Sequence, residues 1–124
     1  MLNQVTLIGR IATEIDLRYT PGKGTAVAKF NLAVNRNYNS KQEADFIRVE
    51  VWGKQAENTA QYVGKGSKVA VTGELNIDQY EKDGQKRTAT KVKANNVTFL
   101  DSKKKDFIDE EYQVDESDIP EDIR

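Results

Sequence analysis

Alternation of apolar and polar residues dominates residues 1–100 and predicts β-strands separated by turns. Near the middle of the chain, Ile47, Val49 and Val51 occupy alternate positions, as expected for the buried side of a strand. The intervening positions carry aromatic and charged side chains: Phe46, Arg48, Glu50 and Trp52. Large aromatic rings usually point into a core, so rings on the polar side of a strand indicate another contact partner.

The same period of two predicts strands along most of the chain. The predicted strands are Gln4–Ile11, Ala26–Asn35, Phe46–Trp52, Val69–Tyr80 and Lys86–Ala94, with a short closing segment at Asn96–Leu100. In the fourth strand the apolar positions are Val69, Val71, Leu75 and Ile77. A Pro-Gly step at residues 21–22 and an Asp-Gly step at residues 83–84 mark turns. Gln55–Val63 is the predicted helix, since an apolar side runs along it and Gly64 terminates it.

Five strands with one short helix between the third and the fourth predict an all-β fold. The pattern matches a five-stranded Greek-key barrel of the oligonucleotide/oligosaccharide-binding type, the OB-fold, which often binds single strands across one face. A chain of 124 residues has room for one such domain and a tail.

Composition narrows the chemistry available to the chain. It has no cysteine and no histidine, which excludes disulfides, thiolate zinc sites and catalysis by Cys or His. We therefore expect no cofactor and no metal. The start of the chain lacks a basic segment followed by an apolar run, and no stretch approaches the ~20 apolar residues that span a bilayer. We expect a soluble, cytoplasmic protein with no membrane partner.

Charge is segregated along the chain, although the net charge is only −1. Residues 1–105 contain eighteen Lys or Arg and eleven Asp or Glu, a net charge of +7. Residues 106–124 contain nine acids and one Arg, a net charge of −8. A basic domain suits a polyanion, because phosphate contacts release counterions. We predict a binding domain at 1–105 and an acidic, disordered C-terminal tail at 106–124.

Aromatic residues beside polar or basic neighbours recur in three segments. Tyr80 lies on the polar side of the fourth strand, and Tyr38 follows Arg36 where the second strand leaves the core. Together with Phe46 and Trp52 they predict a surface for flat, negatively charged ligands, and single-stranded nucleic acid has this chemistry. An alternative interpretation is that a ring covers a neighbouring loop or subunit.

Several cations are candidates for phosphate contact. Arg48 and Lys54 are the strongest, because they share the strand side of Phe46 and Trp52. The full set is Arg10, Lys29, Arg36, Arg48, Lys54, Lys82, Lys86, Arg87, Lys91 and Lys93. No group of residues offers base-specific readout, so we expect weak sequence preference.

Six collinear motifs resemble the bacterial single-stranded DNA-binding protein family. The motifs lie at Asn3–Arg10, Leu17–Pro21, Phe30–Val34, Phe46–Glu57, Tyr62–Ser67 and Val71–Leu75. The resemblance implies an OB-fold barrel, a homotetramer around which single-stranded DNA wraps, and a role in DNA replication, recombination and repair. It assigns base stacking to Tyr38, Phe46, Trp52 and Tyr80.

The tail departs from the family pattern in two respects. Almost no linker separates Leu100 from the acidic run, and Asp118-Ile119-Pro120 is followed by Glu121 rather than by a terminal aromatic. The resemblance implies that such a tail recruits replication, recombination or repair proteins, through Asp118, Ile119 and Pro120. The missing aromatic puts docking to the usual partners in doubt, and the short chain suits a phage- or plasmid-encoded relative.

Three other interpretations stay open from the residues alone. Stacking surfaces do not exclude ribose, so the barrel would also suit single-stranded RNA. The aromatic face would also serve a protein-only scaffold. Hydrolysis with a carboxylate-bound metal would need acids such as Asp78, Glu81 and Asp83, but these lie on a predicted hairpin where acids are common. We expect no enzymatic activity.

Overall fold

The computed structural model describes residues 1–38 and 41–101, with the backbone alone for 37, 38, 41 and 42. In these ranges the chain forms six strands and one helix. They are β1 (Val5–Ile11), β2 (Asp16–Tyr19), β3 (Ala26–Tyr38), β4 (Lys41–Trp52), α1 (Lys54–Tyr62), β5 (Lys68–Lys82) and β6 (Gln85–Phe99).

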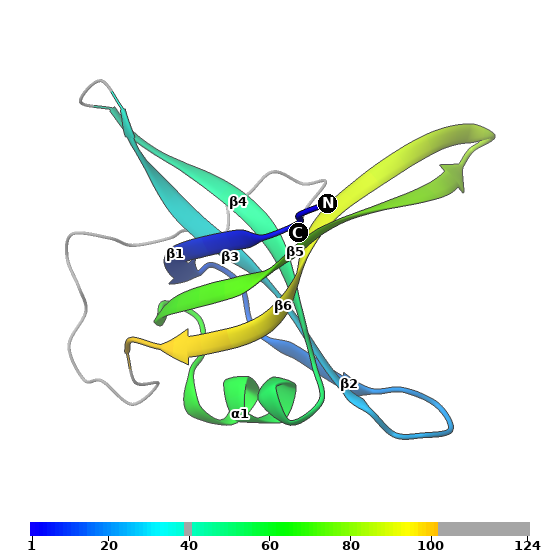
Figure 1. Cartoon of the computed structure of the whole chain (residues 1–124), viewed down its shortest axis with the longest axis horizontal. Coiled ribbons are helices and arrows are strands. Elements are labelled where there is room, and N and C mark those ends of the chain that lie inside the picture. Colours follow the sequence, from blue (N-terminus) through cyan, green and yellow to red (C-terminus); the bar gives the residue numbers. More distant parts are fainter. Residues whose placement is uncertain (39–40, 102–124) are drawn as a thin grey trace.

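The strands close into a barrel because β1 pairs with both β5 and β3. The hydrogen-bonded order is β1-β5-β6-β4-β3-β2, and Arg10 and Ile11 of β1 pair with Ala33 and Leu32 of β3 (Figure 1). β4 and β6 run parallel. The helix follows β4 and lies across one end of the barrel (Figure 1). The predicted OB-fold, with a helix between the third and fourth predicted strands, is confirmed.

The core is built from the apolar positions that alternation predicted. Val49 and Val51 of β4 are buried, and Ile47 packs against the same cluster. The main contributors from all sides of the barrel are Ile11, Ala28, Phe30, Leu32, Val49, Val51, Val69, Val71 and Val92. Since this side of β4 faces the core, its other side faces away from the barrel.

The structure adds a short strand, β2, that alternation does not predict. Its sequence Asp-Leu-Arg-Tyr contains one partly buried residue, Leu17, so no periodic signal can emerge from it. β2 is a strand because it pairs with Ala26–Lys29 of β3.

The last two predicted segments form one continuous strand, β6, interrupted by a bulge. Asn95 is the extra residue, since the pairing with β5 shifts between Thr72 and Gly73. The bulge allows Val92 and Val97 both to be buried despite their odd spacing.

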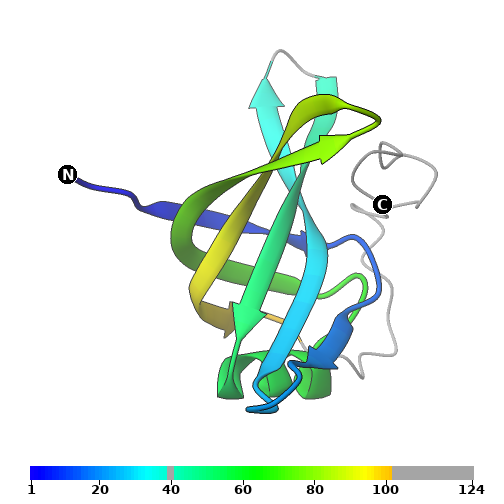
Figure 2. The same ribbon diagram turned by 90° about the vertical axis from the view of Figure 1, so that its right-hand side faces the viewer.

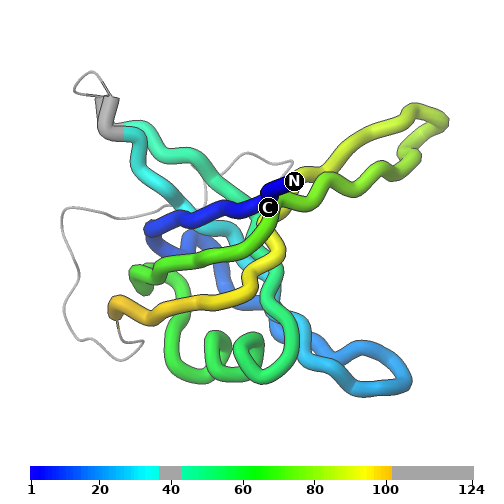
Figure 3. Tube along the Cα trace, in the orientation of Figure 1, coloured from blue at the N-terminus to red at the C-terminus, as the bar shows by residue number. Residues whose placement is uncertain are grey.

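Two hairpin arms, β3–β4 and β5–β6, extend beyond the barrel (Figure 2, Figure 3). Asp83 and Gly84 have φ values of 55° and 77°, which confirms the predicted tight Asp-Gly turn between β5 and β6. Leu75 and Ile77 lie on this arm and are 42% and 59% exposed. Their alternation is as predicted, but this apolar side meets the core only as far as Val71, and Leu75 and Ile77 are exposed because the arm leaves the barrel.

The helix begins and ends one residue earlier than predicted, at Lys54–Tyr62. Ala56 packs from α1 into the core. Gly53, with φ of 74°, turns the chain at the end of β4, so Lys54 is the first helical residue. The prediction that Lys54 shares a strand side with Trp52 is therefore wrong.

Candidate functional site

The outer side of β4 carries the predicted combination of aromatic rings and charges. Trp52 ends this strand and is 39% exposed, so part of its ring is accessible. Phe46 is partly buried and packs against Ala12 and Ala33. Trp52 is the more accessible ring of the strand, whereas Phe46 also contributes to packing.

Sheet pairing brings a lysine from β6 to this ring. The parallel pairing of β4 with β6 places Glu50 opposite Lys93. Lys93 Nζ lies 5.7 Å from the centre of the Trp52 ring, within the range of a cation–π contact. The register of the sheet thus assembles an accessible aromatic ring and a cation from segments far apart in the sequence.

Glu50 of β4 belongs to a charged network that also includes residues of β6 and β5. One carboxylate oxygen accepts a hydrogen bond from Trp52 Nε1, and the other accepts one from Lys91 Nζ at 3.0 Å. Lys91 Nζ also lies 3.1 Å from Asp78 Oδ2 of β5. Burial acts to raise the pKa of Glu50, but hydrogen bonds from Lys91 and Trp52 and the charges of Lys91 and Lys29 outweigh it, so this pKa is lowered. The hydrogen bond to Glu50 is the largest cause of the raised pKa of Lys91.

A pocket of about 400 Å³ adjoins this network. Residues from β3, β4, β5 and β6 contribute to its lining: Lys29, Asn31, Arg48, Glu50, Asp78 and Lys91. Figure 2 shows β3 and β4 side by side, with the β5–β6 hairpin curving across them. Cations that can contact phosphate and polar groups that can contact base edges therefore line one hollow.

The sequence pattern did not single out Asn31 or Thr13 as members of this site. Asn31 is 5% exposed and pairs with Arg48 across β3 and β4. Its backbone N–H donates to Thr13 Oγ1 at 3.0 Å, which holds the loop before β2 at the pocket. Strand register identifies Asn31, and its hydrogen bond identifies Thr13 in the loop after β1; a single sequence specifies neither.

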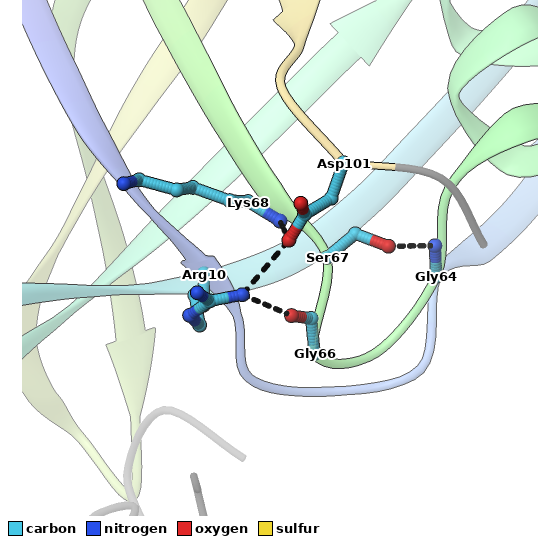
Figure 4. A network of polar contacts seen from close by, with 6 residues as sticks. All are labelled: Arg10, Gly64, Gly66, Ser67, Lys68 and Asp101. Carbon is cyan, nitrogen blue, oxygen red and sulfur yellow. Dashed lines mark hydrogen bonds and ion pairs between the residues drawn. The ribbon is translucent and has the colours of Figure 1, made fainter. Parts of the chain in front are cut away.

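Arg10, a predicted phosphate contact, lies in a different network at the end of β1 (Figure 4). Its Nη1 donates to Asp101 Oδ2 at 2.9 Å and to the Gly66 carbonyl oxygen at 3.1 Å. The Lys68 backbone N–H donates to the same carboxylate oxygen at 3.2 Å. These contacts fasten the chain after β6 to β1 and β5, and the Arg10 side chain is only 14% exposed. Arg10 therefore ties these segments together, and it is not among the residues that line the pocket described above.

Arg36, another predicted phosphate contact, is paired with Asp45 across β3 and β4. Arg36 Nη2 lies 2.7 Å from Asp45 Oδ1, and both side chains are about half exposed. The hydrogen bond from Arg36 holds the pKa of Asp45 below its usual range. Phosphate would have to compete with Asp45 for this guanidinium.

Further predicted residues follow the β5–β6 arm and the outer side of β3. Tyr80 is 45% exposed and lies opposite Arg87. Lys82 and Lys86 are exposed beside the turn of the arm, and Lys29 lies opposite Glu50. The structure thus brings Lys29, Arg48, Lys91 and Lys93 close to Glu50. Tyr80, Lys82, Lys86 and Arg87 lie farther along the β5–β6 arm, which projects from the barrel (Figure 3).

Some predicted features lie outside the described residues. The side chain of Tyr38 is among them, although its backbone belongs to β3. The predicted tail at 106–124, with Asp118, Ile119 and Pro120, is entirely outside them.

Two further observations concern metals and membranes. Within the described residues, no three acidic side chains gather so that they could hold a metal ion. Asp78, considered above for a metal-dependent hydrolase, contacts Lys91. No helix in the described part of the chain has the length and apolarity needed to cross a bilayer.

Comparison with known proteins identifies the family. Residues 2–100 match the single-strand binding protein family. The chain is 48% identical over 103 residues to single-stranded DNA-binding protein 3 of Clostridium acetobutylicum, covering 81% of this chain and 72% of that protein. It is 50% identical over 103 residues to the single-stranded DNA-binding protein of Clostridium tetani, covering 81% and 71%. The corresponding Bacillus cereus protein is 50% identical over 105 residues, covering 82% and 61%. The chain therefore belongs to the single-strand binding protein family.

Proposed function

We propose that this protein binds single-stranded DNA without strong sequence preference and without catalysing a reaction. The observation that carries the proposal is the partly exposed Trp52 ring with Lys93 beside it, next to a pocket lined by Lys29, Arg48 and Lys91. The names of the clostridial relatives, single-stranded DNA-binding proteins, support the same function.

Binding combines stacking with phosphate contact. A base on Trp52 contributes about 1–3 kcal/mol and requires no particular base, because every base has a flat face. Lys93 supplies positive charge next to the ring, and Arg48 and Lys91 supply it at the adjoining pocket. Each phosphate contact adds about 0.7 to the salt slope of single-strand binding. The β5–β6 arm extends the surface with a further ring, Tyr80.

We assign the wider surface as follows. Tyr38, Phe46, Trp52 and Tyr80 stack bases. The phosphate-contacting cations are Lys29, Arg36, Arg48, Lys54, Lys82, Lys86, Arg87, Lys91 and Lys93. Phosphate would also have to compete for Arg10 with Asp101 and the Gly66 carbonyl, as it would for Arg36 with Asp45 and for Lys91 with Glu50.

A direct test is competition for a fluorescently labelled oligo-thymidine, followed by anisotropy at low salt. We expect unlabelled single-stranded DNA to displace the probe better than oligo-uridine or duplex DNA, and the probe to remain intact when Mg²⁺ or Ca²⁺ is added. Stronger displacement by oligo-uridine would assign the surface to RNA. Metal-dependent loss of the probe would show hydrolysis, and no binding at low salt would reject the proposal.

We further propose a homotetramer. Val5–Gly9 pairs with β5, whereas β1 pairs with β3 only at Arg10 and Ile11, which leaves part of the strand edge available for a second copy. Exposed apolar side chains on β1 and β5 favour burial in an assembly: Ile8, Leu75 and Ile77. Light scattering at micromolar concentration should give four copies, and a stable monomer would reject the assembly.

In the cell, we propose a cytoplasmic role in DNA replication, recombination and repair, with a tail at 106–124 that recruits partner proteins through Asp118, Ile119 and Pro120. The nine acids of this segment, tethered to a basic domain, should compete with DNA at low salt. Removing 106–124 should therefore strengthen DNA binding, with a gain that shrinks as salt rises. Equal binding by both forms at low salt would reject the competition, and capture of the same partner proteins by the truncated form would reject recruitment.

A further inference from the structure

Glu50 is an unexpected residue on a surface that receives a polyanion. It lies on the outer side of β4 between Arg48 and Trp52, and it is 7% exposed. A buried carboxylate beside phosphate sites opposes binding through like-charge repulsion. Both of its oxygens are engaged by neighbouring side chains, however, which indicates a role in the local geometry.

The contact between Glu50 and Trp52 constrains the ring without covering it. The two residues lie two positions apart on the same side of β4, and Trp52 Nε1 donates to one Glu50 oxygen. The indole N–H lies in the plane of the ring, so an acceptor bound to it occupies the ring edge. The flat faces of the ring lie outside this contact: Lys93 Nζ lies over the ring, 5.7 Å from its centre, and a base stacks on the part of the ring that stays exposed.

The second Glu50 oxygen is fixed from two other strands. Lys91 of β6 donates to it at 3.0 Å, and the same ammonium lies 3.1 Å from Asp78 of β5. Lys91 is 26% exposed, so water only partly screens this pair. The Trp52 ring is therefore connected through Glu50 to β4, β6 and β5.

We propose that Glu50 is a positioning residue: it holds the Trp52 indole in the orientation in which a base stacks, and Lys91 holds Glu50. This inference rests on the proposed function in DNA binding. It makes a prediction opposite in sign to simple electrostatics. Removing the Glu50 charge alone strengthens binding to phosphate, whereas releasing the Trp52 ring weakens stacking.

Whether Glu50 restrains the Trp52 ring can be tested without DNA. Trp52 is the only tryptophan of the chain, so the tryptophan fluorescence reports on this ring alone. Glu50→Leu removes the acceptor at similar volume, whereas Glu50→Gln retains an oxygen for the indole N–H. We expect the fast component of Trp52 fluorescence anisotropy decay to grow in Glu50→Leu and to stay near the parent value in Glu50→Gln. An unchanged decay in Glu50→Leu would overturn the proposal.

The unmodified protein provides a second measurement that does not depend on a variant folding. Hydrogen exchange of the single indole N–H, followed by NMR, should be at least about tenfold slower than in a free indole, since this proton is hydrogen-bonded. Exchange at the rate of a free indole would overturn the proposal.

Binding of labelled oligo-thymidine then tests the consequence for DNA. Glu50→Leu should bind roughly five- to tenfold more weakly, part of what a stacked ring contributes. In a Trp52→Phe background, which lacks the indole N–H, the same Glu50 change should not weaken binding. Equal or tighter binding by Glu50→Leu in the parent background would overturn the positioning role. If the parent itself does not bind oligo-thymidine, the proposed function fails, while the two Trp52 measurements still decide whether Glu50 holds the ring.

Discussion

Replacing Gly73 by alanine should destabilise the barrel at the bulge between β5 and β6. A Cβ added to Gly73 would lie 2.1 Å from the Lys93 carbonyl oxygen and 2.8 Å from Ala94 Cα. Both are backbone atoms of the paired strand, so no side-chain rotation can relieve the overlap and the strands must separate. Overpacking costs about 1–3 kcal/mol, and the upper end applies here because the backbone itself must move. For a domain of this size, such a loss lowers Tm by roughly 10–20 °C.

Gly84→Ala is the matched control, since its added Cβ meets nothing within 4 Å and only its φ of 77° is unfavourable. It should cost about 1 kcal/mol. Urea unfolding and thermal scans, both followed by circular dichroism, measure the loss of unfolding free energy in Gly73→Ala and in Gly84→Ala. Because Lys93 lies beside Trp52, Gly73→Ala should also alter Trp52 emission, and Gly84→Ala should not. Equal losses in the two variants would refute the argument from close packing.

Other expectations follow from the site and its ion pairs. Trp52→Ala should weaken oligo-thymidine binding by about 1–3 kcal/mol at unchanged salt slope, whereas Arg48→Ala should flatten that slope by about 0.7; salt-series titrations that show the reverse would contradict the assigned roles. Asp101→Ala leaves the partly buried Arg10 without its carboxylate, so unfolding in urea should require about 1–3 kcal/mol less while DNA affinity is retained. The lowered pKa of Glu50 contributes stability above its unfolded-state value near 4.5, and this is lost as pH falls through the folded-state pKa. The parent should therefore lose stability relative to Glu50→Gln below about pH 4.5. If the difference in unfolding free energy between the two proteins does not change with pH, the carboxylate is not stabilised in the folded state.

Alternation predicted the strands whose two sides face core and solvent. It identified Val49 and Val51 as core and Trp52 as outward-facing, and the Asp-Gly turn followed from its residue types. Alternation alone does not show where a strand stops facing the core while its apolar period continues. Leu75 and Ile77 continue an apolar pattern into an arm that has left the barrel.

The candidate site was less predictable because it depends on strand register. Lys93 meets Trp52, and Lys91 meets Glu50, only because β6 pairs with β4 at one offset. Charge and spacing do not reveal that Arg10 is committed to Asp101. Basic residues in one sequence can therefore be proposed as phosphate contacts, but their pairing is decided by the fold.

The most direct test of the account is a titration with labelled oligo-thymidine in which the anisotropy of the label and the emission of Trp52 are recorded together over a series of salt concentrations. We expect Trp52 emission to fall in step with the rise in anisotropy, and the apparent affinity to drop steadily as salt increases. A rise in anisotropy with constant Trp52 emission would show that DNA binds elsewhere on the protein and would contradict the assignment of this face.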